Sequence, residues 1–142
     1  MAIQVSAEAL QAFLMQEFPQ ATITVEQVSE EAVWVRQPVD ESHLRPGGTV
    51  SGPTMMSSAD TAAYVAVLAH IGIVPLAVTS NLNINFLRKP EAGKALLAKG
   101  TVLHLGRRSV LSEVNIYSEG NLEKAVAHAV VTYAIPSSHA SK

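Results

Sequence analysis

The sequence predicts an α+β fold in which an antiparallel β-sheet wraps around one long, buried central helix. A segment between Pro53 and Gly72 is apolar on nearly all sides, which is typical of a helix that is covered all round. Four strand-like segments with turn signals between them follow this helix, and two shorter ones precede it. The length of 142 residues fits one domain that covers positions 1–142.

The N-terminal segment is expected to be helical over about 6–18. Ser6 is a suitable N-cap, Leu10 and Leu14 lie one turn apart, and Pro19 follows the segment. Two β-rich pieces then flank a polar Ser-Glu-Glu turn. The loop that follows is rich in glycine and proline, and its composition predicts neither helix nor strand.

The central helix is expected over about 53–71. A proline suits its first position, because a proline lacks the N–H that is not needed there, and Gly72 is a typical end signal. Among the later strands, the pattern is clearest where Leu82, Ile84 and Phe86 alternate with three asparagines. These elements together favour a sheet whose strands are joined by short turns.

Composition excludes several classes of protein. The chain has no cysteine, so it has neither disulfides nor a thiolate nucleophile. No basic residue precedes the first apolar positions, so we expect no secretory signal and a cytoplasmic location. Gly72 and Pro75 interrupt the longest uncharged stretch, which argues against a membrane span. The tail over about 137–142 is expected to be frayed.

Asp60 is the only fully charged residue between Ser51 and His70. Burying a lone carboxylate costs several kcal/mol unless the group is paired or hydrogen-bonded. A structural interpretation is that Asp60 pairs with Arg45 or accepts hydrogen bonds from nearby hydroxyls. A functional interpretation is that Asp60 is catalytic.

Basic residues are concentrated between positions 88 and 108. This stretch contains six basic residues and a single acidic residue. They are either solvated strand ends or a site for a small polyanion. Nucleic acid is not expected as a partner, because no aromatic residues are interleaved with these charges. The histidines lack the spacing of metal ligands, so the sequence predicts no metal site and no cofactor.

The loop and helix start "HLRPGGTVSGPTMMSSADTA", the strand "VTSNLNINFLRKP" and the closing "AHAVVTYAIP" resemble the hotdog-fold acyl-CoA thioesterases of the phenylacetate-degradation type. In that family a loop H-x-N-x-x-G-x-x-H-G-G is followed, eight residues after the first glycine of HGG, by an aspartate on the central helix. His43, Gly48 and Gly52 match this frame, and Asp60 stands at the expected aspartate position. The resemblance covers roughly residues 20–136 and implies a hotdog fold.

Three residues depart from the family pattern. Arg45 stands in place of the usual asparagine, Ser51 in place of the histidine, and Pro53 in place of the second glycine. Arg45 is open to two roles, pairing with Asp60 or binding the substrate carbonyl. Ser51 lies beside the expected substrate site, and its simplest role is to cap the central helix. His43 is expected to fix the loop.

The resemblance implies hydrolysis of an acyl-CoA thioester to the free acid and CoA. The Gly52 N–H at the helix N-terminus would polarise the carbonyl. Asp60, two turns along, would reach the same carbonyl as a general base or a nucleophile. In this family a hydroxyl from another subunit positions the water; Thr79 matches it, with Ser80 as the alternative. Tyr64, four residues after Asp60, either borders the acyl pocket or is a core residue.

Acyl-CoA and a second copy of the chain are the expected partners. The resemblance and the sheet edge left open in a single protomer predict a homodimer that assembles further into a homotetramer. The resemblance implies that some of the basic residues bind the phosphates of CoA. The residues expected to bind them are Arg88, Lys89, Arg107 and Arg108.

Two other functions remain open from the sequence. One is a non-catalytic acyl-CoA-binding protein, because Arg45 and Ser51 replace the two loop residues most associated with the active family. The other is a dehydratase acting on 3-hydroxyacyl thioesters. That chemistry needs a histidine near the helix carboxylate, and Ser51 removes the most obvious candidate, so this function ranks last.

Overall fold

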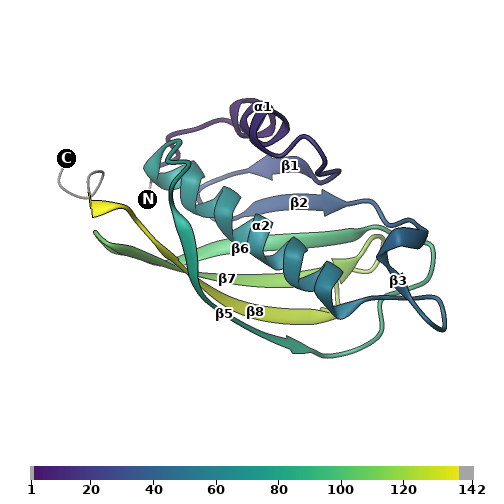
Figure 1. Cartoon of the computed structure of the whole chain (residues 1–142). Coiled ribbons are helices and arrows are strands. Elements are labelled where there is room, and N and C mark those ends of the chain that lie inside the picture. The colour runs from purple at the N-terminus through teal and green to yellow at the C-terminus, as the bar shows by residue number, and fades with distance from the viewer. Residues whose placement is uncertain (1, 138–142) are drawn as a thin grey trace.

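The computed structural model describes residues 2–137; the tail predicted to be frayed lies outside these residues from position 138 onward. A six-stranded antiparallel sheet curves around the long helix α2, and the shorter helix α1 lies beside the first strand (Figure 1). This arrangement confirms the predicted α+β class and the antiparallel sheet around a central helix.

The sheet has the strand order β1-β2-β6-β7-β8-β5, and every neighbouring pair is antiparallel. The strand that directly follows α2 is therefore at one edge of the sheet, with β1 at the other edge. The strands are β1 (Thr24–Val28), β2 (Val33–Gln37), β5 (Val78–Phe86), β6 (Leu96–Leu105), β7 (Ser109–Ser118) and β8 (Ala127–Ala134).

Helix α2 spans Gly52–Ile71 and is buried on most sides, as its uniformly apolar sequence predicts. Ser51 caps its start, and Gly72, with a φ of 96°, ends it. A positive φ is costly for residues with a side chain, which explains glycine at this position. Within residues 2–137, no helix is both long enough and apolar enough to cross a membrane.

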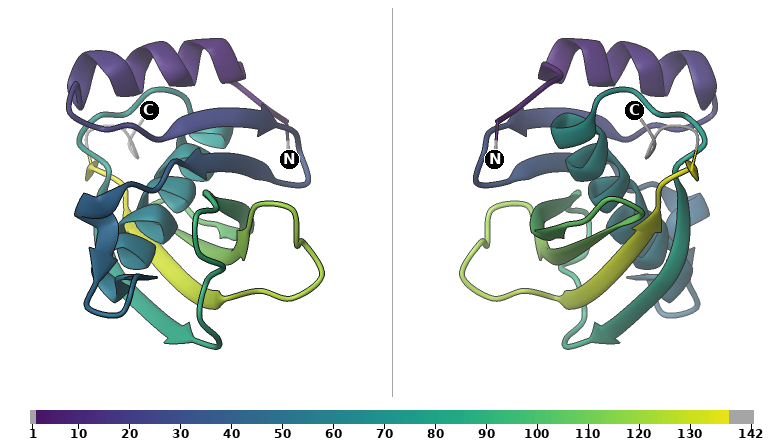
Figure 2. Two further views of the ribbon diagram at one scale, coloured as in Figure 1. Left: turned by 90° about the vertical axis from the view of Figure 1, so that its right-hand side faces the viewer. Right: turned by 90° about the vertical axis from the view of Figure 1, so that its left-hand side faces the viewer.

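Helix α1 spans Ala7–Glu17 and lies along β1, at the edge of the sheet remote from β5 (Figure 2). The Ser6 hydroxyl accepts a hydrogen bond from the N–H of Ala9 at 3.1 Å, as expected of an N-cap. The side chain of Gln11 accepts a hydrogen bond from the N–H of Val25 at 2.6 Å and ties the helix to β1.

The loop before α2 is more regular than the sequence predicts. It contains a short 3₁₀ helix η1 and a two-stranded hairpin, so the expectation of an irregular loop is wrong. The imidazole Nδ1 of His43 accepts from the N–H of Asp40 at 2.9 Å, and the carbonyl of His43 accepts from the N–H of Ser51 at 2.9 Å. Local capping therefore gives the loop its order. The elements are η1 (Glu41–His43), β3 (Leu44–Arg45) and β4 (Thr49–Val50).

The backbone of α2 approaches β6 closely at Gly100. A Cβ atom there would lie 2.8 Å from the carbonyl oxygen of Ala62 and 3.3 Å from a methyl group of Val33. We expect Gly100→Ala to lower the free energy of unfolding by about 2 kcal/mol, because overpacking of a rigid core is destabilising. Urea unfolding measures this effect, with Lys99→Ala on the opposite face of β6 as the control. Equal stability of the two variants would contradict the close approach.

Candidate functional site

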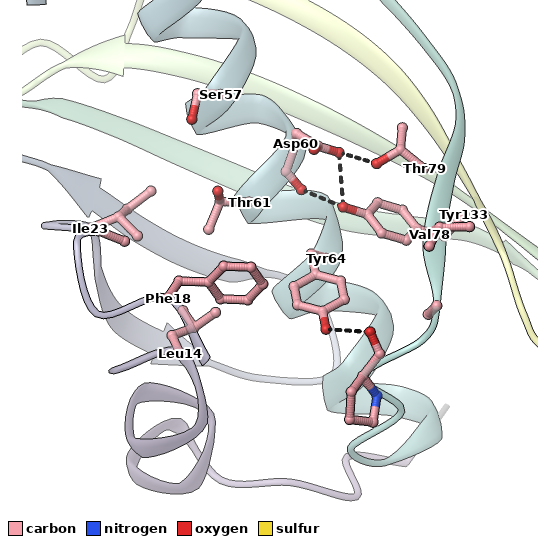
Figure 3. A pocket seen from close by; sticks show the side chains of 13 residues that line it. Leu14, Phe18, Ile23, Ser57, Asp60, Thr61, Tyr64, Val78, Thr79 and Tyr133 are labelled. Atoms are coloured by element: carbon pink, nitrogen blue, oxygen red, sulfur yellow. Dashed lines mark hydrogen bonds between the residues drawn. The ribbon is translucent and has the colours of Figure 1, made fainter. Parts of the chain in front are cut away.

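The carboxylate of Asp60 is half-buried on α2 and accepts two hydrogen bonds on the same oxygen (Figure 3). The hydroxyl of Thr79 donates to Oδ1 at 2.6 Å, and the hydroxyl of Tyr133 donates to Oδ1 at 2.8 Å. Two hydroxyls therefore stabilise the charge of Asp60. This agrees with the structural interpretation in which Asp60 accepts hydrogen bonds from nearby hydroxyls. A held carboxylate is also suited to catalysis, so this contact pattern is compatible with both interpretations.

Thr79 belongs to the same chain as Asp60, whereas the family resemblance implies a hydroxyl from another subunit. This contact within the chain is one that the resemblance does not imply, and a water-positioning hydroxyl from another subunit stays a prediction. The contact arises from a bulge in β5: Thr79 pairs with Tyr133 and Asn81 pairs with Thr132, so Ser80 has no residue opposite it on β8. One extra residue reverses the alternation of side chains, so Thr79 faces α2 together with Leu82. The hydroxyl of Ser80 instead donates to the carbonyl of Thr132 at 3.2 Å.

Tyr133 is a site residue that the sequence analysis missed. It lies opposite Thr79 in the sheet, and its hydroxyl also donates to the backbone carbonyl of Asp60 at 3.1 Å. Burial raises the pKa of Tyr133, and the nearby carboxylate of Asp60 raises it further. Its place on the buried face of β8 follows from period-two alternation, and a buried tyrosine hydroxyl needs a partner. Which partner it finds depends on strand register, which the sequence does not show.

A pocket of about 430 Å³ extends from the Asp60 carboxylate toward α1. Tyr64 lines it, is itself buried, and donates a hydrogen bond to the carbonyl of Pro75 at 3.2 Å. The two expectations for Tyr64, pocket wall and core residue, therefore hold together. We call this space the Asp60 pocket; its described walls are Leu14, Phe18, Ala21, Ile23, Ser57, Asp60, Thr61, Tyr64, Pro75, Ala77, Val78, Thr79 and Tyr133.

The N-terminus of α2 borders a different hollow of about 450 Å³. Ser51 acts as the helix cap, since its hydroxyl accepts from the N–H of Thr54 at 3.3 Å. Gly52 lies over Phe86, and a Cβ at this glycine would be 3.4 Å from the Phe86 ring. We call this space the Gly52 pocket; its described walls are Arg45, Thr49, Val50, Gly52, Met55, Phe86, Leu87, Arg88, Lys89 and Pro90.

Within one chain, Asp60 and Gly52 border different pockets, whereas the sequence analysis expects both of them at one carbonyl. Eight residues of helix separate them by about 12 Å along the axis. They border two pockets that share no wall residue among those described. Arg45 lies in the Gly52 pocket, and no salt bridge to Asp60 is found within residues 2–137. Of the two roles left open for Arg45, pairing with Asp60 is therefore wrong.

The four cations expected to bind CoA phosphates fall into two pairs. Arg88 and Lys89 line the Gly52 pocket, and the guanidinium of Arg88 donates to the carbonyl of Ala125. Arg107 and Arg108 lie in the turn between β6 and β7, toward the end of the sheet where β5 begins. A single chain therefore does not bring the two pairs together.

Neither pocket has the donor set of a metal centre. In the part of the chain that the structure describes, no three His, Asp or Glu side chains converge in a way that would hold a metal ion. His43 orders the loop, as expected, and His128 pairs with Glu113 at 2.9 Å on the face of the sheet remote from α2.

Comparisons with known proteins agree with this architecture. The thioesterase superfamily model matches residues 47–125. A candidate thioesterase from Silicibacter sp. TM1040 is 41% identical, with a TM-score of 0.87, over 96% of this chain and 95% of that chain. A thioesterase from Haemophilus influenzae is 21% identical, with a TM-score of 0.81 and the same coverage values.

A mutant of the phenylacetic acid degradation protein PaaI from Thermus thermophilus is 24% identical, with a TM-score of 0.70, over 87% of this chain and 98% of that chain. A similarity to a structure at this level of sequence identity shows the fold alone. No curated protein matches the sequence significantly. The family match over more than half of the chain, together with the 41% identical structure, is decisive: this chain belongs to the thioesterase superfamily and has its hotdog fold.

Proposed function

We propose that the protein hydrolyses acyl-CoA thioesters, with Asp60 as the general base or nucleophile. The observation that carries the proposal is the Asp60 carboxylate itself. It is half-buried, oriented by two hydroxyls, and opens into a pocket with walls such as Leu14, Phe18 and Ile23 that suit an acyl group. Membership of the thioesterase superfamily supplies the reaction class.

The second half of the site is proposed to come from a partner chain. Strand β5 is an edge strand, and Val78 and Phe86 near its two ends are 56% and 49% exposed. Exposed edges of this kind readily pair with another strand. Val78 borders the Asp60 pocket, and Phe86 borders the Gly52 pocket.

Antiparallel pairing of two β5 strands about a twofold axis would reverse one strand against the other. The Thr79 end of one copy would then lie beside the Phe86 end of its partner. The Asp60 pocket of one chain would face the Gly52 pocket of the other. Asp60 of one chain and Gly52 of its partner could then reach the same carbonyl, although within a single chain eight helical residues separate them by about 12 Å. The active unit is therefore a homodimer, and pairing of two dimers gives the homotetramer expected from the sequence.

In this dimer the thioester carbonyl would sit at the helix N-terminus, where the N–H of Gly52 is directed away from the helix body. This donor, together with the helix dipole, would stabilise the negative charge that develops on the carbonyl oxygen. Asp60 of the facing chain would take a proton from water as the water attacks, and would pass it to the thiolate as the C–S bond breaks, so that the free acid and the CoA thiol leave. In the nucleophilic route, Asp60 would attack the carbonyl and displace the CoA thiolate, which gains a proton from solvent. Water would then hydrolyse the mixed anhydride to release the acid and restore Asp60.

The nucleotide end of CoA would lie outside the shared cleft. Arg45, Arg88 and Lys89 supply three cationic side chains beside the Gly52 pocket, and cations of this kind bind phosphate oxygens. Antiparallel pairing of β5 would also bring the partner copy's β6–β7 turn toward these cations. Arg107 and Arg108 of that turn would then join the same phosphate site.

The test is a thiol-release assay over a panel of acyl-CoA substrates of differing chain length and shape. We expect turnover with at least one acyl group, by a species that light scattering shows to be a dimer or larger. Tight binding of acyl-CoA without thiol release would favour the non-catalytic binding function. Loss of water from 3-hydroxyacyl-CoA, without thiol release, would favour the dehydratase.

A further inference from the structure

The two oxygens of the Asp60 carboxylate have different surroundings. Oδ1 accepts hydrogen bonds from Thr79 and Tyr133, whereas no protein donor to Oδ2 is found within residues 2–137. Two donors on one oxygen fix the rotation of the carboxylate, since both bonds are lost when it turns. The second oxygen is left available to a water or a carbonyl carbon (Figure 3).

Tyr133 is the more buried of the two donors. The residue is 4% exposed, and its ring stacks on Tyr64 with centroids 5.5 Å apart. The Tyr64 ring in turn meets the Phe18 ring edge-on at 6.2 Å. Thr79, by contrast, lies on an exposed edge strand. The packed aromatic rings therefore hold the Tyr133 hydroxyl in place before any partner chain arrives.

We propose that Tyr133 is a positioning residue for Asp60, which fixes Oδ1 and presents Oδ2 to the reacting group. The proposal rests on the proposed hydrolase function, and it adds a residue of β8 to the site. Because burial and the Asp60 carboxylate raise the pKa of Tyr133, its hydroxyl keeps its proton across the working range and remains a donor.

The kinetic test uses Tyr133→Phe, which keeps the stacked ring and deletes only the hydroxyl. We expect kcat to fall about 10- to 100-fold with little change in KM, as for loss of one hydrogen bond to a charged group. Tyr117→Phe is the matched control, because it removes a tyrosine hydroxyl outside both pockets.

A second measurement does not depend on turnover. The chain has only two aspartates, Asp40 and Asp60, so aspartate-selective ¹³C labelling gives two side-chain carboxyl signals. In Tyr133→Phe, the chemical shift of the Asp60 carboxyl signal should change, because this carboxylate loses one of its two hydroxyl donors, while the Asp40 signal should not change. If the wild type hydrolyses no thioester, the proposed function fails, yet this measurement still decides whether Tyr133 acts on Asp60.

The double variant Tyr133→Phe/Thr79→Val tests whether the two donors act as one unit. The combined loss in kcat should be smaller than the product of the single losses, because either deletion already frees the carboxylate to rotate. The proposal is overturned if Tyr133→Phe matches Tyr117→Phe in kcat and leaves the Asp60 carboxyl signal unchanged. A drop in thermal stability alone, without these effects, would show a purely structural role.

Discussion

Asp60→Asn should reduce thiol release from acyl-CoA by about 100- to 10,000-fold, the range expected when a general base or nucleophile is lost. Asparagine has nearly the same shape as aspartate, and its side-chain oxygen can still accept from Thr79 and Tyr133. It cannot take a proton from water at neutral pH, and it is a poor nucleophile. The loss should therefore appear in kcat, while the unfolding temperature stays close to that of the wild type.

Asp40→Asn is the matched control for this experiment. Asp40 is the other aspartate of the chain, lies exposed at the start of η1, and belongs to neither pocket. Its replacement should leave kcat and KM unchanged, because asparagine can still cap η1. Equal rates for Asp60→Asn and the wild type would remove Asp60 from the chemistry and leave its two hydrogen bonds as a structural arrangement only.

Two inactive variants should restore activity to each other if the site is shared between chains. The first is Asp60→Asn, and the second is Gly52→Pro, which deletes the backbone N–H. Ser51 has a ψ of 153°, the extended conformation that a following proline requires, and proline is tolerated at the first helical position. Gly52→Ala keeps the N–H and should be the milder variant. Alone, Gly52→Pro should lose about 100- to 1,000-fold in kcat.

Co-expression of the two variants in equal amounts should recover about one quarter of the wild-type rate. Half of the dimers would then be mixed, and each mixed dimer holds one site with both Asp60 and the Gly52 N–H intact. Co-expression of Asp60→Asn with Asp60→Ala is the control and should recover nothing. No recovery in the first mixture would mean that Asp60 and Gly52 serve the same chain, against the separation of the two pockets.

Local sequence patterns were sufficient for most of the fold. The start and end of α2 follow from Ser51 and Gly72, and the alternation of Leu82 and Ile84 with asparagines marks β5, because these signals act over a few residues. The order in the loop around His43 was missed, since it depends on side-chain contacts with Asp40 rather than on composition.

The candidate site likewise contains one residue that the sequence predicts and one that it does not. Asp60 stands out in the sequence as a lone charge in an apolar helix, and the spacing from Gly52 carries the family resemblance. Tyr133 does not stand out, because a tyrosine at an alternating strand position is ordinary core material. Its role arises from β8 lying between β7 and β5, which brings residues 73 positions apart into hydrogen-bond contact.

The central helix, its caps, the strand pattern and one isolated carboxylate can all be read from the chain alone, because each depends on neighbouring residues. The packed structure was needed to show which hydroxyls hold that carboxylate and which pocket it borders. The bulge at Ser80 turns Thr79 toward α2, and the packing places Asp60 and Gly52 in two different pockets. Strand register is a property of the packed chain, since a shift of one residue reverses a strand's faces without changing its composition.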